Sequence, residues 1–130
     1  RQEEHLIWHA NFGSDAARTA ATKILASPDR PDALVVLDDY MAMGVVLAAR
    51  ELGLRIPQDI GMVAFNDSNL CDLLEGGLSS VSLNIDEMVR AAGDALLAII
   101  EGRPEDAPVR TIVPCELRAR GSSIREGVPR

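Results

Sequence analysis

Two short apolar runs separated by one helical segment constrain the fold of this chain most strongly. The first run is ALVVL at residues 33–37, and the second is IGMVAF at residues 60–65. Both are continuous and rich in β-branched side chains, which is typical of strands buried on both faces. Between them, apolar residues recur at helical spacing over residues 40–52, and Gly53 and Pro57 end the helix. The pattern predicts a βαβ unit with parallel strands and a right-handed crossover.

The residues before the first run add a further predicted strand and helix. The segment HLIWHANF, residues 5–12, is apolar enough to form a strand. Ser14 can cap a helix whose apolar residues continue to Leu25, and the prolines of the following SPDRP segment stop that helix. The resulting order is strand, helix, strand, helix, strand. We therefore expect an α/β fold in which a parallel sheet carries helices on both faces.

The second half of the chain is less regular. An irregular loop at residues 66–77 ends in two glycines, and LSSVSLNI at residues 78–85 follows as a short extended segment. A helix then begins at about Asp86. The segment TIVPCELRAR, residues 111–120, reads as a last strand, and its Pro114 favours an edge position or a bend because proline cannot donate to a sheet ladder.

The composition excludes several classes of protein. The length of 130 residues suits one domain, and the net charge of -7 argues against direct binding of a polyanion such as DNA. No apolar run is long enough to span a bilayer. Cys71 and Cys115 have no Cys or His neighbour at metal-ligand spacing, so we expect buried or half-buried free thiols and no metal or cofactor. Because the sequence begins without Met, we expect a part of a longer protein.

Polar residues follow the predicted strands at the point where each strand ends. Asp38 and Asp39 follow the first apolar run, Asn66 and Asp67 follow the second, and Phe12 ends the segment at residues 5–12. The carboxyl ends of parallel strands meet at one edge of a sheet, and ligands bind outside that edge. We expect Asp38 and Asn66 to contact a ligand. Asp39 and Asp67 are expected to cap a helix and to shape a turn.

Catalysis is a weaker interpretation of the same residues. Two carboxylates could act as a general acid and a general base. However, the sequence has no nucleophile elbow, no glycine-rich phosphate loop and no HExxH motif. A receiver-like signalling domain remains an alternative, although it needs a lysine after a late strand, and the single lysine, Lys23, lies in a predicted helix. We predict a binding protein without catalytic residues.

The order of these motifs resembles a known family. Residues 30–67, RPDALVVLDDYMAMGVVLAARELGLRIPQDIGMVAFND, resemble the effector-binding core of the lactose-repressor/galactose-repressor (LacI/GalR) family of transcription regulators. The resemblance continues through GGLSSVSLNIDEMVRAAGDALLAIIEG, residues 76–102, and PCELRARGSS, residues 114–123. It implies a periplasmic-binding-protein-like core, type I, of two α/β subdomains. This chain would form an incomplete C-terminal subdomain of that core.

The resemblance also implies the role of individual residues. Phe12 matches an aromatic residue that stacks on the ligand, and Asp38 and Asn66 match residues that hydrogen-bond it. Relative to the common pattern, the acid and the amide have exchanged places at the last two positions, which leaves the identity of the ligand open. The dimer surface of the family maps onto four apolar residues: Met43, Leu47, Leu73 and Leu74.

The resemblance finally implies a domain arrangement and partners. Residues 1–123 would belong to the effector-binding core, residues 81–108 would cross toward a missing subdomain, and residues 124–130 would form a tail. The expected partners are a small-molecule effector such as a sugar, a second copy of the chain, and operator DNA bound through a separate domain. The expected location is the cytoplasm, without a membrane partner. The alternative is a periplasmic sugar-binding protein of a transport system, which shares the fold.

Overall fold

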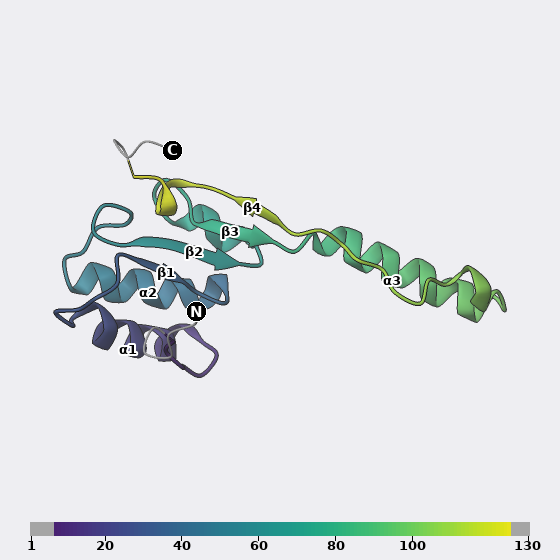
Figure 1. Ribbon diagram of the computed structural model, residues 1–130, viewed down its shortest axis with the longest axis horizontal. Coiled ribbons are helices and arrows are strands. Elements are labelled where there is room, and N and C mark those ends of the chain that lie inside the picture. The colour runs from purple at the N-terminus through teal and green to yellow at the C-terminus, as the bar shows by residue number, and fades with distance from the viewer. Residues whose placement is uncertain (1–6, 126–130) are drawn as a thin grey trace.

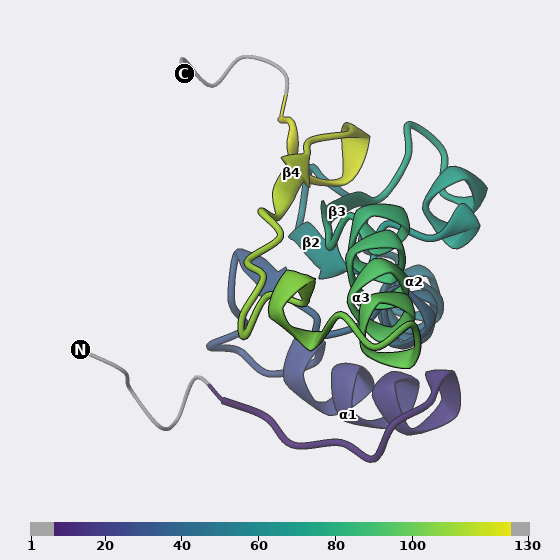
Figure 2. The ribbon, with the colours of Figure 1, turned by 90° about the vertical axis from the view of Figure 1, so that its right-hand side faces the viewer.

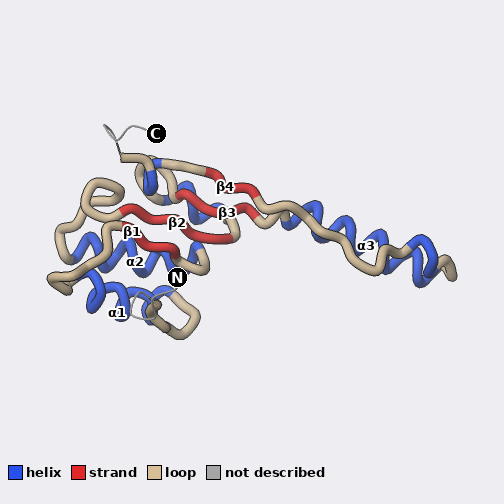
Figure 3. The backbone as a smooth tube through the Cα atoms, in the orientation of Figure 1, coloured by secondary structure: helices blue, strands red, loops and turns tan. Residues whose placement is uncertain are grey.

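The computed structural model describes residues 7–125 and contains a four-stranded sheet in its compact part, from which one long helix extends (Figures 1 and 3). The strands lie in the order β1-β2-β3-β4. Their bounds are β1 Ala33–Val35, β2 Gly61–Phe65, β3 Ser79–Ser82 and β4 Glu116–Arg118. Strands β1, β2 and β3 run parallel, whereas β4 is antiparallel to β3 at the edge of the sheet. The α/β fold and the edge position of the last strand are confirmed, and the sheet is mixed rather than fully parallel.

The sheet is covered on one face among the described residues. Helix α2, Asp39–Glu51, packs on β2, and the core that it forms with the sheet contains the buried Met62 and Ala64. In contrast, Val35 of β1 and Leu117 of β4 are exposed. The prediction that the first apolar run is buried on both faces is therefore wrong for this chain. The physical reason is that both helices of the compact part lie on the same side of the sheet (Figure 2).

Helix α1, Ser14–Leu25, crosses α2 at very short range. Gly44 of α2 makes this approach possible, because a Cβ atom at that position would lie 2.1 Å from the carbonyl oxygen of Ser14 and 2.8 Å from the backbone nitrogen of Arg18. Both neighbours are backbone atoms, which cannot rotate away. The glycine therefore fixes how closely the two helices can pack.

Replacement of this glycine should destabilise the fold. We expect Gly44→Ala to lower the free energy of unfolding by about 1–3 kcal/mol or more, the usual cost of an overpacked contact. Gly93→Ala is the matched control, because Gly93 lies in a helix with open space around its Cα and should gain up to about 1 kcal/mol of helix propensity. Urea unfolding of both variants measures the difference. Equal stability of Gly44→Ala and wild type would contradict the packing argument.

Helix α3, Ile85–Ile100, extends away from the sheet (Figures 1 and 2). The chain turns in the short 3₁₀ helix η3, Pro104–Asp106, and returns alongside α3 to β4. Most apolar side chains of α3 are exposed, and Ala98 is its buried residue. Residues 81 and 82 still belong to β3, and the expectation that residues 81–108 cross toward a further subdomain stays a prediction.

Two shorter segments complete the description. The loop after β2 contains the 3₁₀ helix η2, Asn69–Leu73, and a further 3₁₀ turn, η4, spans Gly121–Ser123. Residues 7–11 form no strand, so the prediction for residues 5–12 is wrong in its described part, and its first two residues lie outside the described residues. Most of the predicted tail also lies outside them. None of the helices within residues 7–125 has the length and apolar character that crossing a membrane requires.

Candidate functional site

Asp38 lies at the carboxyl end of β1 and caps α2. Its backbone is extended, and its Oδ1 atom accepts hydrogen bonds from the backbone N–H groups of Tyr40, at 2.8 Å, and Met41, at 3.2 Å. This is the geometry of an N-cap, in which the residue before the first helical residue satisfies free N–H groups. The prediction that Asp39 caps the helix is therefore wrong, because the helix begins at Asp39 and the cap lies one residue earlier.

Asn66 lies at the carboxyl end of β2 and meets Asp38. The Nδ2 atom of Asn66 donates a hydrogen bond of 2.7 Å to Oδ2 of Asp38. The structure thus brings together two of the three residues that were predicted to contact the ligand. Their chain separation is 28 residues, and parallel pairing of β1 with β2 places their strand ends side by side.

Asp39 is a buried carboxylate, with 1% of the residue exposed. Its Oδ2 atom accepts a 2.7 Å hydrogen bond from the backbone N–H of Ser68, and its Oδ1 atom accepts one of 2.7 Å from the hydroxyl of Ser80. The same hydroxyl oxygen accepts a bond from the backbone N–H of Asp67. Asp39 therefore joins the start of α2 to β3 and to the loop that follows β2.

Asp67 is held by two arginines that the sequence did not indicate. Its carboxylate lies 2.7 Å from Nη1 of Arg118 and 2.8 Å from Nη2 of Arg120, and its side chain is 3% exposed. The hydrogen bond to Asp67 raises the pKa of Arg120 above its ordinary value. The sequence carried no signal for this cluster, because Arg118 and Arg120 are 51 or more residues away from Asp67 along the chain. The carboxylate of Asp67 thus pairs with these two charges, whereas its expected role in shaping a turn stays a prediction.

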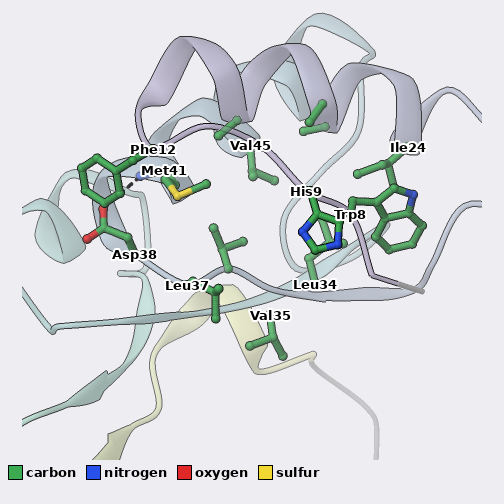
Figure 4. Close-up of a pocket in the computed structure, with 15 residues that line it drawn as sticks. Trp8, His9, Phe12, Ile24, Leu34, Val35, Leu37, Asp38, Met41 and Val45 are labelled. Carbon is green, nitrogen blue, oxygen red and sulfur yellow. Dashed lines mark hydrogen bonds between the residues drawn. The ribbon is translucent and has the colours of Figure 1, made fainter. Parts of the chain in front are cut away.

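Phe12 and Asp38 line one cavity, and Asn66 lines another. The first cavity, of about 350 Å³, is mostly apolar and lies between the segment before α1, helices α1 and α2, and β1 (Figure 4). The second, of about 650 Å³, is polar and lies between the ends of β2 and β3 and the start of α3. The hydrogen bond between Asp38 and Asn66 connects the two linings. Phe12 is 75% exposed, so its ring is available for stacking.

The four residues predicted for a dimer surface divide into two pairs. Leu47 of α2 and Leu73 of η2 are exposed, by 42% and 72%, and η2 contacts α2. Met43 and Leu74 are partly buried and pack against the core. Tyr40, which the sequence analysis did not select, is exposed and lies on the same helical face as Met43 and Leu47 by its spacing. The exposed part of the predicted surface is thus smaller than expected, and Tyr40 extends it.

The two cysteines have different environments. Cys71 is buried, and desolvation together with the nearby charge of Asp39 raises the pKa of its thiol to about 11. Cys115 is exposed, so the expectation of a buried or half-buried thiol is wrong there. Within residues 7–125, no cluster of His, Cys, Asp and Glu side chains has the geometry to hold a metal ion. The polar groups of the site can therefore offer hydrogen bonds to a ligand, and Phe12 can offer a flat apolar surface.

Comparison with known proteins agrees with this architecture. Residues 2–123 match the family described as the periplasmic binding protein-like domain. The HTH-type transcriptional regulator MalR of Streptomyces coelicolor is 33% identical over 121 residues, which cover 93% of this chain and 34% of that protein. The lactose operon repressor of Rhizobium radiobacter is 37% identical over 103 residues, which cover 79% of this chain and 89% of that protein.

A solved structure supports the same assignment. The LacI family transcriptional regulator from Arthrobacter sp. FB24 in complex with lactose superimposes with a TM-score of 0.79 at 29% identity, covering 88% of this chain and 43% of that one. These matches define a periplasmic-binding-protein-like domain of a regulator. The chain belongs to the LacI/GalR family and corresponds to part of its effector-binding core. It spans about a third of the length of MalR.

Proposed function

We propose that this chain forms part of the effector-binding core of a cytoplasmic transcription regulator, and that the effector is a sugar or a related small metabolite. The observation that carries the proposal is the Asp38–Asn66 hydrogen bond at the carboxyl ends of β1 and β2, beside the exposed ring of Phe12. Hydroxyl groups can donate to the carboxylate and can bond with the amide, whereas the apolar face of a sugar can stack on an aromatic ring.

The relatives favour a regulator over the alternatives. Both curated relatives described above are named as regulators or repressors, and the Arthrobacter regulator was solved with lactose. Neither a transport-system binding protein nor a receiver-like domain gains support from the contacts of the described residues. In the proposed mechanism, the effector favours one arrangement of two subdomains by its differential affinity for the two arrangements. The net negative charge indicates that operator DNA is bound by another domain.

A nuclear magnetic resonance titration of this chain with lactose tests the proposed site. We expect shift changes concentrated at Phe12, Asp38 and Asn66, with a dissociation constant on the order of 1 mM because this chain supplies only one side of the proposed cleft. Phe12→Ala should weaken binding by about tenfold, the scale of one aromatic contact. Leu52→Ala, a change to an exposed side chain at the C-terminal end of α2, opposite the end that Asp38 caps, should leave binding unchanged.

Titrations with two other sugars test whether the site binds sugars other than lactose. Cellobiose and ribose are titrated in the same way, because the exchange of acid and amide leaves the preferred sugar open. If none of the three sugars shifts the resonances of these residues, the proposal of a sugar effector fails. If shifts occur but Phe12→Ala binds as tightly as wild type, the site has been placed at the wrong residues.

We further propose that the chain associates with a second copy of itself through the surface formed by Leu47 and Leu73 together with Tyr40. These exposed side chains lie on α2 and η2, two elements that contact each other. A two-fold dimer would match a two-fold symmetric operator site. Met43 and Leu74 support this patch from below rather than forming its centre.

A further inference from the structure

The loop that carries Asn66 has an unfavourable backbone conformation. Asn66 has φ 97° and the following Asp67 has φ 54°, and neither residue is glycine. Residues other than glycine rarely adopt positive φ angles, and they keep such a conformation only where the surrounding contacts hold the backbone in place. Asn66 reaches Asp38 from this conformation. The question is which contacts hold the loop in place.

The backbone N–H of Asn66 donates a 3.0 Å hydrogen bond to the carbonyl oxygen of Val81, and Arg118 and Arg120 pair with Asp67. The two remaining contacts of the loop lead to the carboxylate of Asp39. One oxygen accepts from the backbone N–H of Ser68, immediately after the two strained residues. The other oxygen accepts from the hydroxyl of Ser80, whose oxygen in turn accepts from the backbone N–H of Asp67 at 3.0 Å. Asp39 thus fixes two consecutive backbone N–H groups of the loop, one directly and one through Ser80. Asp39 and Ser80 are both almost fully buried, so water does not replace these bonds easily.

We propose that Asp39 is a positioning residue of the effector site: its buried carboxylate, acting through Ser68 and Ser80, holds the loop that aims Asn66 at Asp38. The inference rests on the proposed function, because it assigns Asp39 to the site that binds the effector. Asp39 does not itself contact the ligand. The two neighbouring acids have complementary roles, since Asp38 caps α2 and receives Asn66, whereas Asp39 fixes the strained loop from below.

The same carboxylate connects the site to the proposed dimer surface. Ser68 is the residue that precedes η2, and Asp39 is the first residue of α2. Asp39 therefore joins the starting points of the two elements that carry Leu73 and Leu47.

Nuclear magnetic resonance of the free chain tests this role without any ligand. Asp39→Asn keeps the shape of the side chain but replaces one acceptor oxygen with a donor, so one of its two partners loses its bond. We expect the side-chain amide signals of Asn66 to move toward those of a free asparagine. We also expect the exchange rates of the backbone N–H groups of Asp67 and Ser68 to rise about tenfold more than those of β2, because the β2 groups report only the loss of global stability.

Control variants separate positioning from a general loss of stability. Asp15→Asn removes an exposed first-turn acid from α1 and should leave the Asn66 signals unchanged. Ser80→Ala removes the acceptor of the Asp67 N–H and the donor to Oδ1 of Asp39 but leaves the bond from Ser68 to Asp39, so it should speed exchange at Asp67 more than at Ser68. If Asp39→Asn does not fold, the Asn66 amide signals and the exchange rate at Asp67 in Ser80→Ala show whether the loop is displaced.

Two results would contradict the positioning role of Asp39. Unchanged Asn66 signals in a folded Asp39→Asn or Ser80→Ala variant would overturn the positioning role. Uniformly faster exchange across β2 and the loop, with Asn66 still on Asp38, would also overturn it, because Asp39 would then stabilise the fold without directing the loop. Since no effector is present, failure of the positioning role is distinguishable from failure of the proposed sugar binding.

Discussion

Asp39→Ala should lower the free energy of unfolding by about 3 kcal/mol, clearly more than Asp38→Ala. The larger loss follows because removal of the buried carboxylate leaves the hydroxyl of Ser80 and the N–H of Ser68 without their acceptor, and each orphaned group costs about 1–3 kcal/mol. Asp38→Ala removes an N-cap at a partly exposed site, which costs about 0.5–2 kcal/mol. Urea unfolding of the two variants measures the order.

A third variant calibrates the comparison. Asp15 is an exposed acid in the first turn of α1 with an ordinary helix-dipole contribution, so Asp15→Ala should cost at most about 1 kcal/mol. The assignment of roles is wrong if Asp38→Ala proves as destabilising as Asp39→Ala. It is also wrong if all three variants lose similar amounts, because a general effect of charge removal would then explain the data.

Leu73→Asp should raise the dissociation constant of the proposed dimer by at least about a hundredfold. Burial of a leucine side chain contributes about 1.5–3 kcal/mol, and in a two-fold dimer the substitution occurs twice. Each 1.4 kcal/mol changes the constant tenfold. Leu73 is the residue of choice because it is 72% exposed, so its replacement should not disturb the monomer. Leu74 packs against the core, and Leu74→Asp would mix unfolding with dissociation.

Sedimentation equilibrium of wild type, Leu73→Asp and Leu117→Asp measures the association. Leu117 is an exposed leucine on β4, outside the proposed surface, and its substitution controls for the effect of an added charge. We expect Leu117→Asp to associate as wild type does. A wild-type chain that is monomeric at micromolar concentration would refute the proposal, as would association that persists in Leu73→Asp but is lost in Leu117→Asp.

The sequence by itself predicted the βαβ core and the place of two polar residues at one edge of its sheet. Continuous apolar runs at residues 33–37 and 60–65, separated by a helix of fitting length, are typical of a βαβ unit with parallel strands. That arrangement brings the residues after the two strands together, so Asp38 and Asn66 meet as expected. These results follow from local periodicity and from the geometry of parallel strands.

The tertiary structure decided which of the two neighbouring acids caps α2 and which one accepts hydrogen bonds from the loop and from β3. Asp38 and Asp39 are both compatible with a cap, and the choice depends on the residue at which the helix begins. It also depends on Ser80 and Ser68, which lie about 30 to 40 residues further along the chain and supply the donors for the second carboxylate. Contacts over such separations leave no periodic trace in a sequence, and the same holds for the arginines that pair with Asp67.

Burial likewise depended on the tertiary structure. The alternation of apolar residues shows which side chains can be buried, but exposure depends on what packs against each face. Val35 and Leu37 belong to an apolar run and are nevertheless exposed, because α1 and α2 both lie on the opposite side of the sheet. Leu74 and Leu73 are adjacent and chemically identical, yet one packs against the core and the other faces outward. The sequence determines which side chains are apolar, and the three-dimensional arrangement of the elements determines which of them are buried.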